Sequence, residues 1–412
     1  MSIPASVFPE WAEPMPEIGR GVYRLTTGPR DHRHAYHKHC PWSPDGSEVL
    51  LLRHNRTHPT GEVCLLDLSD GQMEVVGETT FWTDHEAAQQ QWTGRRPCVL
   101  FRIEKKGEDI LVRVDTETGE RREYPGNITP DHTSPAGRYV FGRTPLAEMF
   151  PEDRIAPRHD KGLARLDLDT GRKAVIVSLE RLVEMHPDTE TVRPCHNYVK
   201  QTIVQPRTGR LLFVFGNDSF WRAMEEPMVK MLCTVDPDGS DLRMLGSIGD
   251  HPMWHPIENV VLFNTHVADV GKRIALVPDD EGEERGYLDD WRGGGHPSLS
   301  PDARYLLTDA YNREENEASI RLIDREAGTE YRPAVMNNPG NVKAHARALE
   351  ADYGGKGIVA SLRNGIRNVR MGVFNTHCHP SWSREGRFVL FNSDHDGVSQ
   401  LYLLDRREAL CD

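Results

Sequence analysis

The clearest pattern in the chain is a short polar turn followed by a run in which apolar residues dominate. Four segments share this pattern closely and two are looser copies. They are WSPDGSEVLLLRH (42–54), TSPAGRYVFGR (133–143), LSPDARYLLTD (299–309), WSREGRFVLFN (382–392), PRTGRLLFVFGN (206–217) and HPIENVVLFNT (255–265). Pro, Asp and Gly supply the fixed and the positive φ angles that tight turns need. Each segment therefore predicts a turn that joins two antiparallel strands.

A second strand-like run follows in each repeat and ends in Asp or other turn residues. The seven runs are 63–72, 110–120, 164–172, 231–241, 273–282, 319–330 and 400–409. Repeats of about 40 to 60 residues with several short strands each are typical of propeller blades. We predict an all-β fold, a seven-bladed β-propeller that forms a single domain over residues 1–412. An additional strand near 21–27 is expected to complete the last blade and to close the ring, which would bury two exposed sheet edges.

Residues 334–370 interrupt the repeat between blades six and seven. This stretch contains helix formers separated by glycines and has no strand alternation. It predicts a partly helical insertion. Such an insertion either covers one face of the propeller or packs on the surface across two blades.

The charge of the chain narrows the possible partners. The formal net charge is -13 and no region is rich in Lys and Arg, so we expect no nucleic-acid partner. No segment has the length and apolarity of a membrane span, and the first residues lack the pattern of a secretory signal, which predicts a cytoplasmic protein without a membrane partner. Seven dispersed cysteines without a CxxC pair predict neither a disulfide framework nor a zinc knuckle. The oligomeric state is left open.

Histidines recur at one place in the repeat, just before the turn. In a propeller the first strand of each blade lines the central channel, so side chains at this place are expected to converge at one mouth of the channel. For any single position, a buried His bonded to a carbonyl is the commoner explanation, whereas a converging set indicates metal binding or proton transfer. The residues at this place are His37, His39, Gln89 to Gln91, His132, His196, His251, His255, His296, His377 and His379.

Three of these histidines form the predicted metal site. His377 and His379 are two residues apart, so on a β-strand their rings would share one face while the residue between them points away. His296 follows three glycines, Gly293–Gly295, which permit a close approach of the backbone. Neutral imidazoles suit Mn, Zn, Fe or Ni. We predict these three histidines as ligands, with Asn375 or a water in a fourth position.

Two segments that contain these histidines resemble the oligogalacturonate lyases of polysaccharide lyase family 22, which are seven-bladed propellers. They are GGGHPSLSPD (293–302) and NTHCHPSWSREGRFVLFNSDHDGVSQLYLLD (375–405), and the resemblance extends from about residue 39 to the C-terminus. It implies cleavage of oligouronides by β-elimination with a Mn²⁺-like cation held by three histidines and a glutamine; Zn²⁺, Ni²⁺ and Fe²⁺ are alternatives. His296, His377 and His379 match the three histidines. The glutamine has no match, and Asn375 is the nearest amide.

The resemblance also implies catalytic roles. His251, in GDHPMWHP, matches the catalytic base, and the catalytic arginine falls near Arg222 and Lys230. A cation on the uronate carboxylate would stabilise the charge that develops while the base removes the C5 proton and the C4 oxygen leaves. The candidate substrate-binding residues are His39, His196 and Trp254.

Other functions stay open at this stage. Another uronic-acid polysaccharide such as ulvan is an alternative substrate, and a non-enzymatic TolB-like or WD40-like binding propeller is an alternative class, because the turn motif is common to such propellers. A glycosidase and a propeller peptidase are disfavoured, since the first-strand positions hold no carboxylate pair and the chain has no Gly-x-Ser-x-Gly motif. Tryptophans near the turns serve either as sugar platforms or, more commonly, in packing between blades. Residues 31–40 (DHRHAYHKHC) either help to bind substrate or form a solvated loop.

Overall fold

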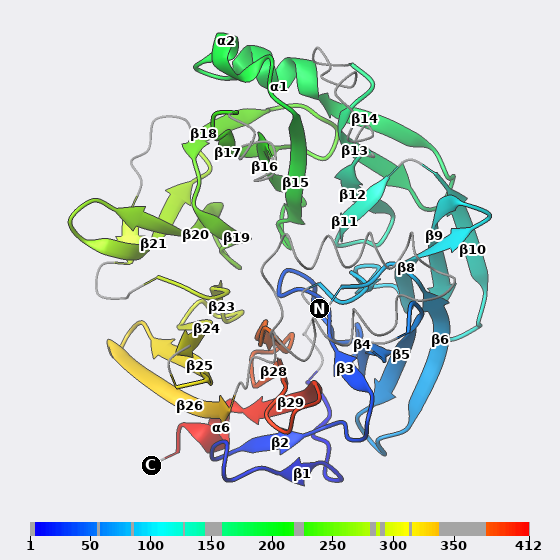
Figure 1. Ribbon diagram of the computed structural model, residues 1–412, viewed down its shortest axis with the longest axis vertical. Coiled ribbons are helices and arrows are strands. Elements are labelled where there is room, and N and C mark those ends of the chain that lie inside the picture. The colour runs from blue at the N-terminus through cyan, green and yellow to red at the C-terminus, as the bar shows by residue number, and fades with distance from the viewer. Residues whose placement is uncertain are drawn as a thin grey trace. The chain divides into compact units, whose positions relative to one another are not determined.

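The structure, a computed structural model, shows the strand arrangement of a seven-bladed β-propeller. It describes residues 5–55, 58–83, 86–126, 128–144, 159–217, 226–280, 286–288, 293–312, 315–337 and 376–411. In this part of the chain the strands form seven antiparallel sheets, six with four strands and one with five (Figure 1). The fold class predicted from the turn-and-strand repeat is thereby confirmed.

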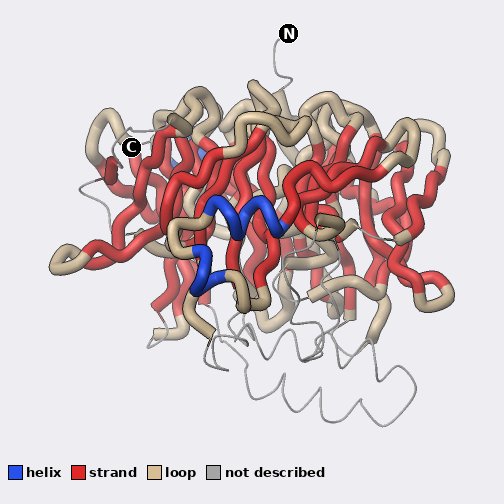
Figure 2. The backbone as a smooth tube through the Cα atoms, turned by 90° about the horizontal axis from the view of Figure 1, so that it is seen from above, coloured by secondary structure: helices blue, strands red, loops and turns tan. Residues whose placement is uncertain are grey.

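Little of the described backbone is helical, as Figure 2 shows. The helices are α1 (Leu179–Met185), α2 (Thr189–Val192) and α6 (Arg406–Ala409). Among the described residues, no helix combines the length and the apolar character that crossing a bilayer requires.

Contacts within the chain group its residues into two compact units, and the single domain expected from the sequence stays a prediction. The first unit comprises Met1–Trp92, Pro97–Pro125 and Ser298–Asp412. This unit contains four sheets, and the strands of each are given in the order in which they pair. The five-stranded sheet consists of β1 (Glu13–Pro14), β2 (Val22–Arg24), β29 (Gln400–Asp405), β28 (Phe388–Ser393) and β27 (Ser381–Trp382). The three four-stranded sheets consist of β3 (Asp31–Arg33), β4 (Glu48–His54), β5 (Gly61–Asp67) and β6 (Met73–Thr79); of β10 (Arg121–Pro125), β9 (Glu108–Asp115), β8 (Cys98–Lys105) and β7 (Gln91–Trp92); and of β23 (Ser298–Leu299), β24 (Tyr305–Asn312), β25 (Glu317–Asp324) and β26 (Thr329–Asn337).

The second unit comprises Thr93–Arg96 and Gly126–Pro297. It contains three four-stranded sheets, with strands given in the order in which they pair. They consist of β11 (Thr129–Thr133), β12 (Tyr139–Arg143), β13 (Gly162–Asp167) and β14 (Lys173–Ser178); of β15 (Asn197–Val204), β16 (Leu211–Asn217), β17 (Lys230–Val235) and β18 (Arg243–Ser247); and of β19 (Asp250–Trp254), β20 (Val260–Val267), β21 (Gly271–Pro278) and β22 (Gly286–Leu288).

An Asp at the end of the third strand of a sheet fixes the turn that follows it. Asp324 Oδ1 accepts hydrogen bonds from the backbone amides of Glu326 and Ala327, and Oδ2 pairs with Arg304, which stands just before the second strand, at 2.7 Å. The hydrogen bond from Arg304 lowers the pKa of Asp324 to about 2. The same pair recurs as Arg138–Asp167 and Arg387–Asp405. The Asp that recurs at the end of each repeat in the sequence therefore has a structural role, because it binds the amides of the following turn and a neighbouring arginine.

Neighbouring sheets bury large apolar side chains between them. In the second unit, Phe141 from one sheet and Phe213 and Phe215 from the next belong to the same cluster and are fully buried. In the first unit, Leu307 and Phe391 play the equivalent part. Burial of each such side chain contributes about 1.5–3 kcal/mol, so packing between sheets is a major source of stability in each unit.

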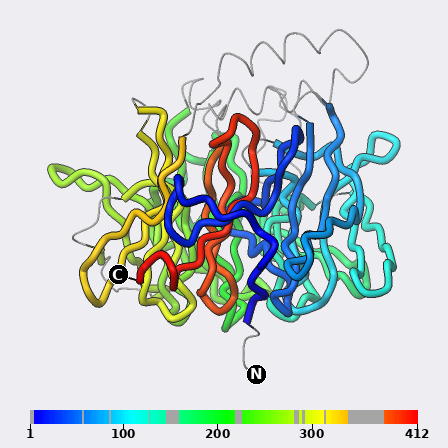
Figure 3. Tube along the Cα trace, turned by 90° about the horizontal axis from the view of Figure 1, so that it is seen from below, coloured from blue at the N-terminus to red at the C-terminus, as the bar shows by residue number. Residues whose placement is uncertain are grey.

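A strand from the N-terminal region completes the sheet formed by the C-terminal strands. β2 pairs antiparallel with β29, in the register Val22↔Leu404 and Arg24↔Tyr402 (Figure 3). β2 lies within the segment 21–27 for which the sequence predicted such a strand. The predicted insertion is less well matched at its start, because 334–337 belong to β26; the rest of it, 338–370, lies outside the described residues.

His32 in β3 is a buried titratable group away from the predicted metal ligands. Its Nδ1 donates a hydrogen bond of 2.9 Å to Oε1 of Gln400. Burial lowers the pKa of His32 to about 4. A histidine in an unfolded chain titrates near pH 6.5, so on acidification the unfolded chain takes up this proton first. The stability that depends on neutral His32 is complete above about pH 6.5 and is lost as the pH falls toward 4.

We predict that His32→Asn flattens the acid dependence of stability. Between pH 7 and pH 4.5 the variant should lose about 2 kcal/mol less of its free energy of unfolding than the wild type. Urea unfolding at both pH values measures this difference. His266→Asn, at an exposed histidine, should keep the wild-type pH dependence, and an equal loss in His32→Asn and wild type would contradict the prediction.

Candidate functional site

The recurring histidines lie within or close to the first strand of their sheets. His132 and His251 lie within β11 and β19, and His196 directly precedes β15. His296 lies two residues before β23. His37 and His39 lie between β3 and the bridge that Trp42 makes with Val49, and His377 and His379 lie just before β27.

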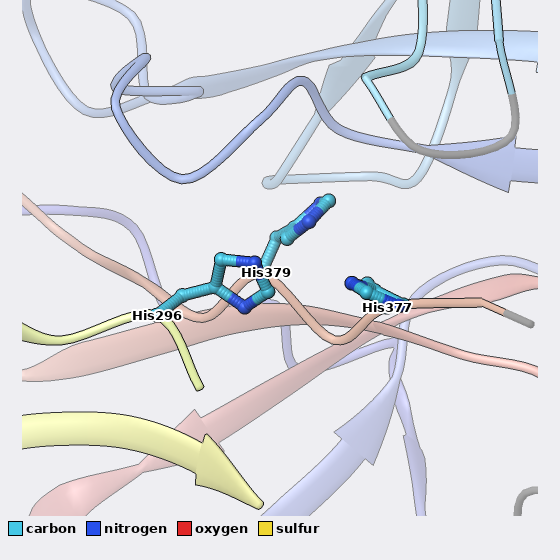
Figure 4. Close-up of side chains that lie close together, drawn as sticks. All are labelled: His296, His377 and His379. Carbon is cyan, nitrogen blue, oxygen red and sulfur yellow. The ribbon is translucent and has the colours of Figure 1, made fainter. Parts of the chain in front are cut away.

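Three of these histidines form a cluster with the geometry of a metal site. One ring nitrogen from each of His296, His377 and His379 lies within 4.8 Å of the others (Figure 4). His296 and His379 are buried and His377 is half-buried. These are the three residues predicted as ligands. Imidazole nitrogens bind first-row metals at about 2.0–2.1 Å, so small side-chain rotations bring three nitrogens this close onto a common ion. The donor set fits a divalent transition metal.

The backbone around His377 and His379 differs from the prediction. These residues are not on a strand, because β27 begins at Ser381. The backbone of His379 is left-handed, with φ of +46°, and the ring centroids of His377 and His379 are 5.5 Å apart. An irregular segment with a left-handed residue therefore brings the rings together, and the alternation of a strand does not.

Tyr311 and Asp309 in β24 hold this segment through hydrogen bonds to its backbone. Tyr311 Oη accepts a hydrogen bond from the amide of Cys378 at 2.8 Å and donates one to Asp309 Oδ2 at 2.6 Å. The same carboxylate oxygen accepts the amide of His379 at 3.3 Å. Burial, assisted by the charge of Asp309, raises the pKa of Tyr311 well above its ordinary value, so its hydroxyl keeps the proton that it donates. Sequence reasoning missed both residues, although polar positions in the apolar run of β24 were a signal.

Asn264 in β20 holds the segment before His296. Its Oδ1 accepts the amide of Gly294 at 2.9 Å, and its Nδ2 donates to the carbonyl of Gly295 at 2.8 Å. A Cβ on Gly293 would lie 2.4 Å from the carbonyl oxygen of Arg273, so this position has no room for a side chain. The close backbone approach predicted for the glycine run is found here, whereas Asn264 was not predicted.

His251 lies next to the cluster. Its ring centroid is 4.4 Å from that of His296, and its Nδ1 is 3.4 Å from Asn264 Nδ2. The ladder of β19 with β20 shifts register between Asp250 and Met253, and His251 has φ of +57°. Bulges of this kind re-aim side chains and are common beside active sites.

Of the two residues predicted as the catalytic cation, Lys230 and Arg222, the structure describes Lys230. Lys230 forms an ion pair with Asp250, and its side chain is 17% exposed. Burial opposes ionisation of Asp250, but the hydrogen bond and charge of Lys230, with the charges of His251 and Lys200, lower the pKa of Asp250 overall. Arg222 and the proposed fourth ligand Asn375 lie outside the described residues.

The predicted substrate-binding residues have different surroundings. The ring of His196 pairs through Nδ1 with Glu226, whose carboxylate also accepts the backbone amide of His196. His39 is buried. Trp254 is 5% exposed, packs in the core between two sheets and donates its indole N–H to the carbonyl of Ile203 at 3.1 Å, which is the packing role that the alternative interpretation of the tryptophans predicts. His255 is also structural, since its Nδ1 accepts the amides of Ile257 and Glu258.

Residues 31–39 are all buried, so this segment is not a solvated loop. The ring of Tyr36 lies 4.8 Å from that of His379, and the ring of His37 lies 6.2 Å from it. Burial lowers the pKa of His34 to about 4. The rings of Tyr36 and His37 therefore form part of the surroundings of His379.

Comparisons with known proteins identify relatives in fold. No protein family and no curated protein matches the sequence. An oligogalacturonate lyase of Vibrio parahaemolyticus is 17% identical over 93% of each chain, with a TM-score of 0.64. A solved oligogalacturonate lyase in complex with manganese is 18% identical over 96% of this chain and 95% of that chain, with a TM-score of 0.65. A prolyl endopeptidase is 11% identical over 92% of this chain and 50% of its own, with a TM-score of 0.52. At these identities the likeness shows a shared propeller fold.

We predict that Tyr311→Phe loosens the segment that carries His377 and His379. Loss of the hydroxyl removes the acceptor of the Cys378 amide, and a buried hydrogen bond contributes about 1 kcal/mol. Amide hydrogen exchange at Cys378 and His379 should become on the order of 5- to 10-fold faster. Tyr287→Phe, at an exposed tyrosine, should leave both rates unchanged. Wild-type rates in Tyr311→Phe would show that other contacts hold the segment.

Proposed function

We propose that this protein is a metal-dependent lyase that cleaves oligouronides, such as oligogalacturonate, by β-elimination. The observation that carries this proposal is the cluster of His296, His377 and His379 with a fourth imidazole, His251, in ring contact with it. A site that removes a proton next to a carboxylate needs two parts, a centre that binds the carboxylate and a base beside it. The two parts correspond to the three-histidine cluster and to His251.

The three histidines are the groups that would hold a divalent cation, with Mn²⁺ as the proposed ion and Zn²⁺, Ni²⁺ and Fe²⁺ as alternatives. A cation bound there supplies Lewis-acid stabilisation of the charge that develops on the uronate carboxylate. Neutral imidazoles leave the charge of such a cation uncompensated, which favours an anionic ligand. The solved relative in complex with manganese supports the choice of ion. Asn375 stays a proposal as a further ligand.

His251 is the proposed base. Asn264 Nδ2 is a donor and faces Nδ1, so the neutral ring carries its lone pair on Nδ1 and its proton on Nε2. The contact between Nδ1 and Asn264 is long, at 3.4 Å, and is therefore easily exchanged for the C5–H of a substrate. The left-handed backbone at His251, within the bulge of β19, changes the direction in which its side chain leaves the strand.

The reaction balances without water. The C5–H bond breaks and its proton passes to Nδ1 of His251, the bonding electrons form the C4=C5 double bond, and the C4–O bond breaks. The leaving oxygen keeps the electron pair of that bond and takes a proton from solvent. Lys230 and Arg222 are the proposed cations for a substrate carboxylate, and Lys230 would exchange its contact with Asp250 for the substrate.

We predict that the purified protein with Mn²⁺ converts oligogalacturonate to products that absorb in the ultraviolet band of unsaturated uronates. A chelator should abolish the signal, and His377→Ala should lose bound metal in elemental analysis, because one of three imidazoles is removed. His266→Ala should keep both metal and activity. Activity on ulvan oligomers alone would move the assignment to another uronide, and absence of activity on a panel of uronides, together with sugar binding, would indicate a binding propeller.

We predict that His251→Asn lowers kcat by about 100- to 10,000-fold and leaves metal content unchanged, since a positioned base contributes a factor of that size. Asn is chosen because it tolerates a left-handed backbone better than Ala. The unfolding midpoint of the variant should stay close to that of the wild type. Activity near the wild-type level would place the base elsewhere.

A further inference from the structure

Gln201 in β15 and the proposed base His251 in β19 occupy equivalent positions in their strands. The register of β15 with β16 shifts so that Gln201 and Thr202 lie opposite one residue. The register of β19 with β20 shifts so that His251 and Pro252 lie opposite one residue in the same way. The first residue of each bulge has a left-handed backbone, with φ of +53° at Gln201 and +57° at His251. The two residues therefore begin bulges of the same kind.

The turns that follow the two bulges show the same correspondence. Four residues after the first residue of each bulge, a side chain caps the turn that leads to the second strand. After β15 this residue is Gln205, whose Oε1 accepts the amide of Thr208 at 3.0 Å. After β19 it is His255, whose Nδ1 accepts the amide of Glu258 at 3.0 Å. The two strands therefore match residue by residue from the bulge to the turn.

β15 and β19 are in contact within the second unit (Figure 1). Trp254, three residues after His251, donates its indole N–H to the carbonyl of Ile203 at 3.1 Å. Ile203 lies two residues after Gln201, and both it and Trp254 belong to one buried apolar cluster. Because this contact lies close to both bulges, Gln201 is on the strand next to that of the proposed base.

The side chain of Gln201 is suited to contact a ligand. It is half-buried, as is that of His251, whereas the second residue of each bulge, Thr202 or Pro252, is buried. No hydrogen bond joins the side-chain amide of Gln201 to another described residue. Glycine or asparagine adopts a left-handed backbone at lower cost than glutamine, so the bulge itself does not require this side chain. Strained residues of this kind cluster at ligand-binding sites.

The other neighbours of His251 indicate which groups of a ligand reach Gln201. The ring of His251 contacts that of His296, which belongs to the proposed site for the metal and the carboxylate. β15 carries none of the three clustered histidines. A sugar acid with its carboxylate at the metal and its C5–H at His251 has hydroxyl groups on the rest of the ring. A primary amide suits hydroxyl groups, because Oε1 accepts and Nε2 donates, and it has no charge to attract a further carboxylate.

We propose that Gln201 binds hydroxyl groups of the sugar next to His251 and makes the site specific for sugars whose hydroxyls are unsubstituted. Oε1 accepts a hydrogen bond from one hydroxyl, and Nε2 donates one to its neighbour. These contacts hold the ring so that its C5–H faces the base. The identity of the sugar as a uronate rests on the proposed function, whereas the contact with Gln201 requires only a sugar with free hydroxyl groups.

The experiment measures binding by calorimetry in the full-length protein with Mn²⁺, in the His251→Asn background, so that a substrate is turned over slowly. The ligands are trigalacturonate and trigalacturonate acetylated at O2 and O3. Gln201→Met keeps the length of the side chain but removes its hydrogen-bonding groups, and Gln201→Gly removes the side chain and relieves the left-handed backbone. Gln72→Met is the matched control, at an exposed glutamine of the first unit.

We expect both Gln201 variants to bind trigalacturonate on the order of 5- to 10-fold more weakly, because hydrogen bonds between uncharged groups contribute modestly. Gln72→Met should bind it as the background protein does. The acetylated ligand should bind equally to all four proteins. Gln201→Gly should unfold at a urea concentration no lower than that of the background protein, whereas a purely structural role of Gln201 would lower this concentration.

Equal trigalacturonate affinity in all four proteins, or no binding by any of them, overturns the role of Gln201. The same loss of affinity for the acetylated ligand overturns its assignment to hydroxyl groups. Formation of unsaturated product by the protein with His251 intact separates this proposal from the proposed function. Product together with equal affinities refutes only the role of Gln201, and absence of product together with the expected losses refutes only the lyase.

Discussion

The pairing of β2 with β29 is the interaction on which the first unit depends. It joins residues 22–24 to residues 402–404, and the sheet that it completes also contains β28 and β27. Without β2, the apolar strand β29 would present an unpaired edge. β27 follows the segment with His377 and His379, so the same sheet anchors two of the three clustered histidines. The fold and the candidate site are therefore linked through a contact between distant parts of the sequence.

The sequence predicts well those features that local chemistry determines. Turn residues such as Pro44-Asp45-Gly46 and the Asp at the end of a third strand act within a few residues of themselves, so the blades and the places of the histidines follow from their spacing. Asp309, Tyr311 and Asn264 were missed because they act on segments that are about 30 to 70 residues away in sequence. The left-handed backbone of His379 was missed because a His-x-His pattern is equally compatible with a strand.

For some candidate residues the sequence predicted the location in the sheet but not the side-chain contacts. Trp254 stands at the expected place in its blade, but its side chain points into the packing between sheets, since a large apolar ring gains more from burial there than from exposure. His255 and His196 belong to the same set of recurring histidines as His251, yet His255 caps a turn and His196 is held by Glu226. The position of a residue in the sequence repeat predicts its location in the sheet, whereas its side-chain contacts determine its role.

The left-handed backbone at His251 and His379 restricts how this site can diversify. Glycine and asparagine adopt such a conformation at low cost, whereas β-branched residues adopt it poorly. Laboratory evolution toward a new metal or a new sugar would therefore sample a narrower set of side chains at these two positions than at His377. Retuning the chemistry of the protein would proceed mainly through the residues around them.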